Sequence, residues 1–569
     1  MDIITEGFAL VGDTVRVEPQ SEGLWGRLAR RPFGVLVIIC LLAWLPGFFS
    51  LPVLDRDEAR FAQASKQMVE SGDWVNIRFG QEPRYKKPAG IYWLQAAATK
   101  ILGRPPYTAI WTYRLPSLLG ALAAVILTFW CFRALAPPKA ALGAALLLGL
   151  SLGVSAEAHI AKTDAVLLAC TVAAQGILLR VYLRARAGAP ALSLPMILLG
   201  WTAVAAGILI KGPVILGVLA LSALGVSLWD RNWVWLKQIR PGLGVALALM
   251  IVLPWLIAIG IVSHGQFFVR ALGHDFAAKL TNGQEGHGAP PGYYILLSTI
   301  TLWPATIGVL PGLGRAFASH DKPAVRFVLL WTVANWLMFE LVPTKLPHYI
   351  LPIYPALAML SGLWLADIGS RGRWEGGLRK AAAIQFAVGA TILAIAISYA
   401  PMRYGEGAPI WLLGLSALGI GVSFFAAYQL WHERRAQALL CAVLAALIFY
   451  PSLMWGTAPR LQRIWLSQRL AKVVDRHHRP GDPPIIVSGY DEPSVIFLLG
   501  TNTRIETGAR AARIAVRQGG LVLVDQYQRA AFLAQIASSH AHVQVDGVVK
   551  GINYSRGRKE SITVYRVLG

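Results

Sequence analysis

Long apolar runs are the feature of this sequence that most restricts its fold. About twenty consecutive apolar residues form a helix long enough to cross the hydrocarbon core of a bilayer. By this criterion the chain contains about thirteen candidate spans. They cover residues 33–53, 115–135, 138–155, 164–183, 194–210, 212–229, 243–262, 293–313, 325–342, 348–367, 381–400, 409–430 and 437–457. The sequence therefore predicts an α-helical polytopic membrane protein.

The composition excludes an ordinary soluble enzyme. Hydrophobic residues make up 55% of the 569 residues and charged residues only 15%, whereas soluble domains carry roughly 25% charged residues. A compact soluble chain has too little interior to bury this much apolar surface. The formal net charge of +23 is typical of cytoplasmic anchors and sites for anionic membrane lipids, so we expect no nucleic-acid partner. The four cysteines lie in apolar stretches, which argues against a disulfide framework or a zinc site.

Lys and Arg residues in the short loops indicate the orientation of the spans. Arginines precede the first run, and placing them in the cytoplasm puts most of the other short basic loops on the same side. An odd number of spans then places the tail outside, in the periplasm of a Gram-negative host. We therefore divide the chain into a cytoplasmic segment 1–32, a membrane domain 33–457 with outer loops 54–114 and 263–292, and an outer domain 458–569.

The tail after residue 457 is predicted to be a small soluble α/β domain. Helical patterns lie near 462–476 and 527–539, and strands are expected at 484–489, 503–506, 521–525, 542–549 and 561–567. No glycine-rich phosphate loop follows any of these strands, so the sequence gives no support to a nucleotide site there.

Carboxylates emerge at the outer ends of two spans. Asp55, Asp57 and Glu58 directly follow the first span, and Asp164 opens the fourth. Acidic residues are favourable at helix N-termini, so Asp164 and one of the three carboxylates after the first span can be explained as helix caps. This explanation does not account for all three of those carboxylates. Charged groups at membrane helix ends are costly and mark functional sites. The remaining carboxylates suit a general base or a metal ligand.

Cations and histidines on the same face complete the set of candidates. Outer loop 54–114 is rich in Lys and Arg although the predicted orientation places it outside. A long loop can be translocated regardless of its charge. The alternative that we favour is that these residues form an outer basic surface for an anion. Each lysine suits a phosphate as a compact cation, or it extends its ammonium to the membrane surface. The histidines of loop 263–292 are irregularly spaced, which makes a metal site there a weak prediction. The cations and histidines concerned are Lys86, Lys87, Lys211, Arg270, His274, His287, Lys345 and His348.

Taken in order, these pieces resemble the GT-C membrane glycosyltransferases of the protein O-mannosyltransferase and aminoarabinose (lipid A) transferase group. The resemblance extends over roughly residues 45–365. The matching pieces are Asp57-Glu-Ala-Arg-Phe-Ala62, Tyr85–Trp93, Asp164, Ile210-Lys-Gly-Pro213, His287-Gly-Ala-Pro290 and Lys345-Leu-Pro-His-Tyr-Ile-Leu-Pro352.

The resemblance implies a GT-C fold and transfer of a sugar from an undecaprenyl-type (polyprenyl) phosphate. By this analogy Asp57 is the main catalytic carboxylate, Asp164 the second, and Glu58 a further candidate. The residues that would hold the donor phosphate or line its pocket are Lys87, Lys211, Arg270, Lys345 and Tyr349, with Lys86, His274, His287 and His348 in support.

The resemblance leaves the acceptor and the metal open. The expected acceptor is lipid A or lipopolysaccharide core on the periplasmic side of the bacterial inner membrane, and the alternative is a protein that receives the sugar from the same donor. A transporter for polyprenyl lipids is a third hypothesis, but transporters carry their charges near mid-membrane. The aminoarabinose enzymes usually have a metal-linked Glu where this chain has Lys86. A divalent metal ion is therefore doubtful, and its ligands are unassigned.

Overall fold

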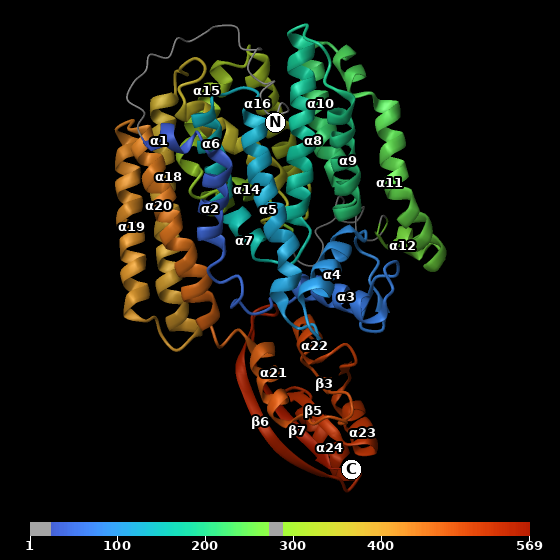
Figure 1. Ribbon diagram of the computed structural model, residues 1–569. Coiled ribbons are helices and arrows are strands. Elements are labelled where there is room, and N and C mark those ends of the chain that lie inside the picture. Colours follow the sequence, from blue (N-terminus) through green and yellow to red (C-terminus); the bar gives the residue numbers. More distant parts are fainter. Residues whose placement is uncertain (1–23, 272, 274–287, 569) are drawn as a thin grey trace.

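Helices coincide with all thirteen apolar runs in the computed structural model, which describes residues 24–271, 273 and 288–568 (Figure 1). Within these residues, eight helices are long and apolar enough to cross a membrane, and the chain is a multi-pass membrane protein. They are α5 (Ile110–Phe132), α8 (Asp164–Arg186), α9 (Leu194–Lys211), α11 (Pro241–Val262), α16 (Pro323–Leu341), α18 (Glu375–Tyr404), α19 (Ile410–Trp431) and α20 (Arg435–Pro451), which continues to Arg460.

The other runs form shorter or broken helices. The run at 138–155 is bent by 62° between α6 (Pro138–Gly149) and α7 (Leu152–Ala158). The run at 293–313 is divided into α14 (Tyr293–Thr301) and α15 (Thr306–Ala318), with Pro304 in the break, because proline has no backbone N–H to continue a helix. The remaining runs are the short helices α2 (Pro32–Trp44), α10 (Val214–Asp230) and α17 (Tyr354–Leu365).

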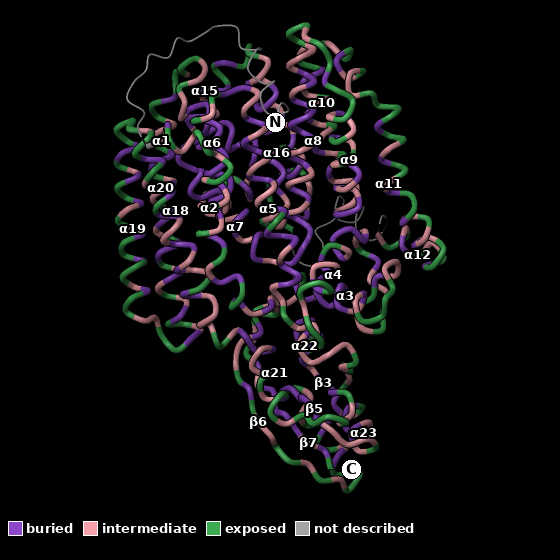
Figure 2. The backbone as a smooth tube through the Cα atoms, viewed as in Figure 1, coloured by how far each residue is buried: buried purple, intermediate pink, exposed green. Residues whose placement is uncertain are grey.

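Burial shows which helices meet lipid (Figure 2). Every residue of α17 except Leu365 at its end is buried, as expected for a helix that is apolar all round and lies inside a bundle. By contrast, only 22% of the apolar window of α11 and 28% of that of α19 are buried inside the protein. Their exposed side chains are aliphatic and aromatic, so the hydrocarbon of the bilayer covers them.

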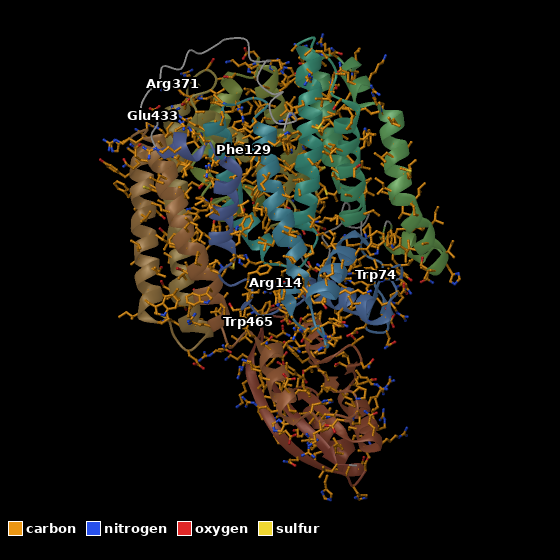
Figure 3. All side chains as sticks on the ribbon, in the orientation of Figure 1. Trp74, Arg114, Phe129, Arg371, Glu433 and Trp465 are labelled. Carbon is orange, nitrogen blue, oxygen red and sulfur yellow. The ribbon has the colours of Figure 1, made fainter. Side chains whose placement is uncertain are left out.

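The outer loop 54–114 folds at one end of this bundle. It contains α3 (Asp57–Ser71), a short hairpin of β1 (Arg78–Phe79) and β2 (Glu82–Pro83), and α4 (Gly90–Leu102), which packs on α3. This end also meets the C-terminal domain (Figure 1). Arg371 and Glu433, from loops assigned to the cytoplasm, lie at the opposite end from Arg114 and Trp465 (Figure 3).

The C-terminal domain contains all five expected strands. They are β3 (Ile486–Ser488), β4 (Arg504–Ile505), β5 (Gly520–Asp525), β6 (His542–Asn553) and β7 (Arg558–Leu568). The sheet order is β4-β3-β5-β7-β6; β3 pairs in parallel with β4 and β5, and β7 pairs antiparallel with β5 and β6.

Helices cover both faces of this sheet. The expected helices are α21 (Leu466–His477) and α24 (Arg529–Ser538), and two further helices, α22 (Pro493–Leu499) and α23 (Gly508–Gln518), were not predicted. Successive strand side chains point to opposite faces, so Val487 packs with α21 and α22 while its neighbour Ile486 packs with α23 and α24. The remaining short elements of the chain are α1 (Leu24–Leu28), η2 (Val234–Ile239), α12 (Gln266–Phe268), η4 (Leu351–Ile353), η5 (Ser452–Thr457) and η6 (Ala458–Arg460).

Candidate functional site

A charged cavity of about 280 Å³ lies where the outer loop 54–114 meets the outer ends of α8 and α9. Its lining contains three aspartates and seven Lys and Arg side chains, together with His348 and Tyr349. The excess of cations makes the cavity attractive to an anion. Its charged residues are Asp55, Arg56, Asp57, Arg60, Arg84, Lys86, Lys87, Lys162, Asp164 and Lys211.

Asp57 is the carboxylate that the cavity leaves most accessible. It is the first residue of α3 and is exposed, and the partial positive charge of a helix N-terminus stabilises an anion at this position. Glu58, one residue later, is buried. The structure therefore presents one of these two neighbours to the cavity.

Asp164 also lines the cavity but is already paired. Lys211 Nζ, at the end of α9, donates a hydrogen bond to Asp164 Oδ1 at 2.5 Å, and His348 Nε2 lies 4.0 Å from Oδ2. The same ammonium lies 5.1 Å from the ring centroid of Tyr349. Asp164 therefore holds Lys211 in place at the cavity wall, because a carboxylate in such a pair is a poor base for another group.

Lys162 is a further cation of the cavity; it is buried and was not predicted as a site residue. Its Nζ lies 2.8 Å from Glu157 Oε1. Burial alone would lower the pKa of Lys162, but Glu157 and Asp164 reverse this effect and leave the pKa raised. The side chain thus keeps its charge. Its position two residues before Asp164 was the available signal.

Lys86 and Lys87 also line the cavity. Arg84, two residues earlier, lies beside them and was also not assigned. Its Nε donates a hydrogen bond to Tyr92 Oη at 3.2 Å, and its guanidinium lies 5.2 Å from the ring centroid of Phe61. These contacts fix the start of the lysine-proline segment against α3 and α4.

Glu58 belongs to the structural support of the site. Arg114 Nε and Nη2 donate to its two carboxylate oxygens at 2.8 and 2.9 Å, and neither side chain is exposed. The backbone N–H groups of Leu54 and Ala161 donate to the same carboxylate at 2.8 and 2.9 Å. With its acceptors occupied, Glu58 ties three segments together and has no place in the cavity lining.

Two of the predicted phosphate ligands also lie elsewhere. Lys345 is buried, and its Nζ donates to the backbone carbonyls of Ala289 and Val342 at 2.9 and 3.0 Å. Arg270 is exposed and is not among the cavity residues. His274 and His287 lie outside the described residues. Neighbours of Lys345, namely Thr344 and Leu346, do line the cavity.

The side chains of the cavity do not fit a divalent metal ion. Among the described residues 24–271, 273 and 288–568, no three His, Cys, Asp or Glu side chains come close enough to share one. In the cavity, the exposed Asp57 lies among lysines, and Lys211 already pairs with Asp164. Ammonium groups repel a metal cation, so we derive no chemical step through a metal.

Chelation is therefore expected to leave the activity of the purified protein nearly unchanged. Incubation with EDTA, followed by dialysis and an assay of sugar transfer, tests this, with zinc- or magnesium-supplemented protein as the control. Strong inhibition that added metal reverses would contradict this assignment.

Comparisons with known proteins identify a matching family profile and similar transferases. The sequence profile of the family described as dolichyl-phosphate-mannose-protein mannosyltransferase matches residues 33–266. The undecaprenyl phosphate-alpha-4-amino-4-deoxy-L-arabinose arabinosyl transferase 2 of Pseudomonas fluorescens is 30% identical over 344 residues, or 58% of this chain and 59% of that protein. The corresponding transferase of Edwardsiella ictaluri is 28% identical over 422 residues, or 70% of this chain and 72% of that protein. The chain thus spans 59% of the length of the Pseudomonas relative.

Solved structures give a likeness over nearly the whole chain. ArnT from Cupriavidus metallidurans in the apo state superposes with a TM-score of 0.71 at 18% identity, covering 94% of this chain and 98% of that protein. The same enzyme bound to undecaprenyl phosphate gives a TM-score of 0.71 at 19% identity, covering 93% and 97%. This likeness confirms the predicted fold class, including the small C-terminal α/β domain.

Proposed function

Because the chain belongs to the GT-C membrane glycosyltransferases related to the protein O-mannosyltransferases and aminoarabinose transferases, we propose that it transfers a sugar from a polyprenyl phosphate. The proposed acceptor is lipid A or lipopolysaccharide core, on the periplasmic side of the bacterial inner membrane. The relatives' names specify an undecaprenyl phosphate donor, and one neighbouring fold was solved with that lipid bound.

The proposal rests on one observation: Asp57 and several cations line the same cavity at the outer end of the bundle. Lys87, Lys162 and Lys211 all line this cavity. A lipid phosphate with its chain in the bilayer reaches such a position from the membrane side. Its sugar then lies over the cavity floor, beside the accessible carboxylate.

The proposed reaction breaks the bond between the anomeric carbon and the donor phosphate and joins that carbon to an acceptor oxygen. The lipid phosphate leaves as a dianion, and fixed cations stabilise the charge that develops on it. Asp57 accepts the proton of a hydroxyl acceptor as the new bond forms. A phosphate acceptor, as on lipid A, is already anionic and needs less assistance from a base.

Mass spectrometry of a deletion strain and its parent tests the proposed acceptor. Loss of a sugar mass from lipid A or core would support the proposal and identify the sugar. Intact glycolipids together with loss of a sugar from a surface protein would favour a protein acceptor, to which the matched family profile points. Unchanged glycolipids and glycoproteins would contradict both.

Lys87→Ala is expected to weaken binding of the donor phosphate by about 10- to 100-fold, because a hydrogen bond to a charged group contributes about 1.5–3 kcal/mol. Binding of undecaprenyl phosphate to the purified protein in nanodiscs measures this effect. The matched control is Lys100→Ala, since Lys100 is an exposed lysine of the same outer loop that does not line the cavity. Equal affinities for the wild type and the Lys87 variant would remove Lys87 from the phosphate site.

A further inference from the structure

The segment that leads into α3 is held from outside the membrane domain. Asp55 and Arg56 connect the first span to Asp57, and both line the cavity. Both residues form hydrogen bonds with the C-terminal domain, more than 400 residues later in the chain. The domain that the sequence analysis left without a role thus touches the two residues that precede the proposed catalytic carboxylate.

Three hydrogen bonds make this contact. Ser494 Oγ, in α22, donates to Asp55 Oδ1. Tyr554 Oη accepts the backbone N–H of Asp55 at 2.6 Å. Arg56 Nη2 donates to the backbone carbonyl of Ser555 at 2.5 Å. Both the side chain and the backbone of the segment are therefore fixed by the same domain.

The backbone of this segment requires such support. Arg56 has φ 62° and ψ −109°, a conformation that non-glycine residues rarely adopt and that persists only when the surrounding structure enforces it. The next residue is Asp57, the first of α3. The direction in which Asp57 leaves the backbone therefore depends on the conformation held at Arg56.

Ser494 is itself held in place by a buried row of hydroxyl groups. Ser467 Oγ lies 2.5 Å from Ser494 Oγ and 3.0 Å from Tyr490 Oη, and all three residues are buried. Because Ser494 gives its proton to Asp55, Ser467 donates to Ser494 and Tyr490 donates to Ser467. The row ends at the Asp55 carboxylate and directs every donor toward it.

The hydrogen bonds to Asp55 also act on its ionisation. Burial, together with the nearby Glu492, raises the pKa of Asp55, and the net value is about 7. Ser494, Tyr554 and Arg56 oppose the rise. Ser494 of the C-terminal domain thus supplies a donor that favours the ionised side chain, whereas Glu492 of the same domain disfavours it.

The domain is anchored on α3 and α5 by a second set of contacts, made by residues that do not line the cavity. The ring of Phe497 is fully buried and meets that of Tyr113 edge-on at 5.4 Å. Thr501 Oγ1 accepts a hydrogen bond from Gln63 Nε2 at 2.9 Å and donates one to Glu70 at 2.6 Å. These contacts secure docking of the domain independently of Ser494 and Tyr554.

We propose that Ser494 and Tyr554 are positioning residues, which fix the Asp55–Arg56 segment from the C-terminal domain and thereby aim Asp57 into the cavity. This inference rests on the proposed function for its effect on catalysis. It assigns the C-terminal domain a part in completing the site, in addition to its docking on the membrane domain.

Ser494→Ala and Tyr554→Phe in the full-length protein test this inference. Each is expected to lower kcat for sugar transfer by roughly 10-fold or more, because small misplacements of a reacting group are costly, with little change in the KM for the donor. Thr501→Val is the matched control, since it removes hydrogen bonds of the same interface but none from the Asp55–Arg56 segment. Its kcat is expected to match that of the wild type.

Hydrogen exchange gives a second measurement that needs no turnover. The Asp55 amide should exchange faster in Tyr554→Phe, which loses its acceptor, and remain protected in Thr501→Val. An active wild type with unchanged kcat in both test variants would overturn the inference and leave the proposed function standing. A wild type without transfer activity would overturn the proposed function, and unchanged Asp55 exchange in Tyr554→Phe would then overturn the positional role as well. Equal losses of kcat in all three variants would indicate docking alone and would also contradict it.

Discussion

Asp57→Asn is expected to lower the rate of sugar transfer by about 10²- to 10⁴-fold, the range that a positioned general base contributes. Asn has nearly the same shape as Asp and is equally acceptable near a helix N-terminus, so the fold and the donor site should persist. Single-turnover transfer by the purified variant, together with undecaprenyl phosphate binding and the melting temperature, measures the three properties separately.

The matched control for this experiment is Asp73→Asn. Asp73 lies just after α3 in the same outer loop, where its Oδ1 accepts the backbone N–H groups of Val75 and Asn76. An Asn side chain keeps that acceptor oxygen, so transfer should be unaffected. Turnover of Asp57→Asn close to that of the wild type would exclude Asp57 as the base.

Substitution of Asp164 should have a different effect, because its carboxylate is already paired with a neighbouring lysine. Its carboxylate pairs with Lys211, whereas Asp57 is exposed to the cavity. The two aspartates that the resemblance groups together thus have different surroundings. One offers a free acceptor for a proton, and the other fixes a cation where the donor phosphate is proposed to bind.

The apolar runs could be located from sequence because the bilayer imposes their length and composition. Their continuity could not be predicted in the same way. The residues on both sides of the break between α14 and α15 are similarly apolar. Hydropathy therefore does not predict the break, which follows from the helical hydrogen bond that Pro304 cannot form. In the same way, the apolar pattern does not predict the 62° bend between α6 and α7.

The roles of the neighbours Asp57 and Glu58 depend on the rotational phase of α3. Successive helical residues point about 100° apart, so only one of the two faces the cavity. Glu58 shares the spacing of the buried Phe61, Ala62 and Ser65, which is the i, i+3, i+4, i+7 pattern of an inward face. That spacing is a sequence signal for a structural role of Glu58.

Other features of the site lay beyond the sequence. Lys345 matches the family motif, yet its ammonium donates hydrogen bonds to backbone carbonyls. Such contacts depend on tertiary structure and cannot be predicted from the motif. Helix α22 has seven residues, too few for a clear periodic pattern. Its contact with Asp55 joins residues 439 positions apart, which local sequence patterns do not encode.

Arg114→Met is expected to lower the free energy of unfolding by about 3–5 kcal/mol, the cost of breaking a buried ion pair by removing one partner. The arginine is fully buried in α5, at the end of the bundle that meets the C-terminal domain (Figure 3). Besides Glu58, it donates to the backbone carbonyls of Leu51 and Pro52 at 2.8 and 2.9 Å. The variant would leave the buried Glu58 carboxylate without its opposite charge and these two carbonyls without this donor. Unfolding in mixed detergent and SDS micelles measures the change.

A double variant separates the ion pair from simple loss of packing. In Glu58→Gln/Arg114→Met no uncompensated charge remains, so it should recover part of the stability lost in Arg114→Met alone. Arg104→Met, at an exposed position of the same loop, should stay within about 0.5 kcal/mol of the wild type.

The same measurements decide what Glu58 does. If Glu58 supports the fold, both Glu58→Gln and Arg114→Met lower the stability of the protein. Activity then falls only in proportion to the folded fraction. If it takes part in the reaction, Glu58→Gln loses transfer activity while its unfolding curve matches that of the wild type. The saturated hydrogen bonding of its carboxylate favours the first result, because a base must have a free lone pair directed at its proton donor. The site would then contain one exposed carboxylate, Asp57, whose position depends on the buried pair one residue later.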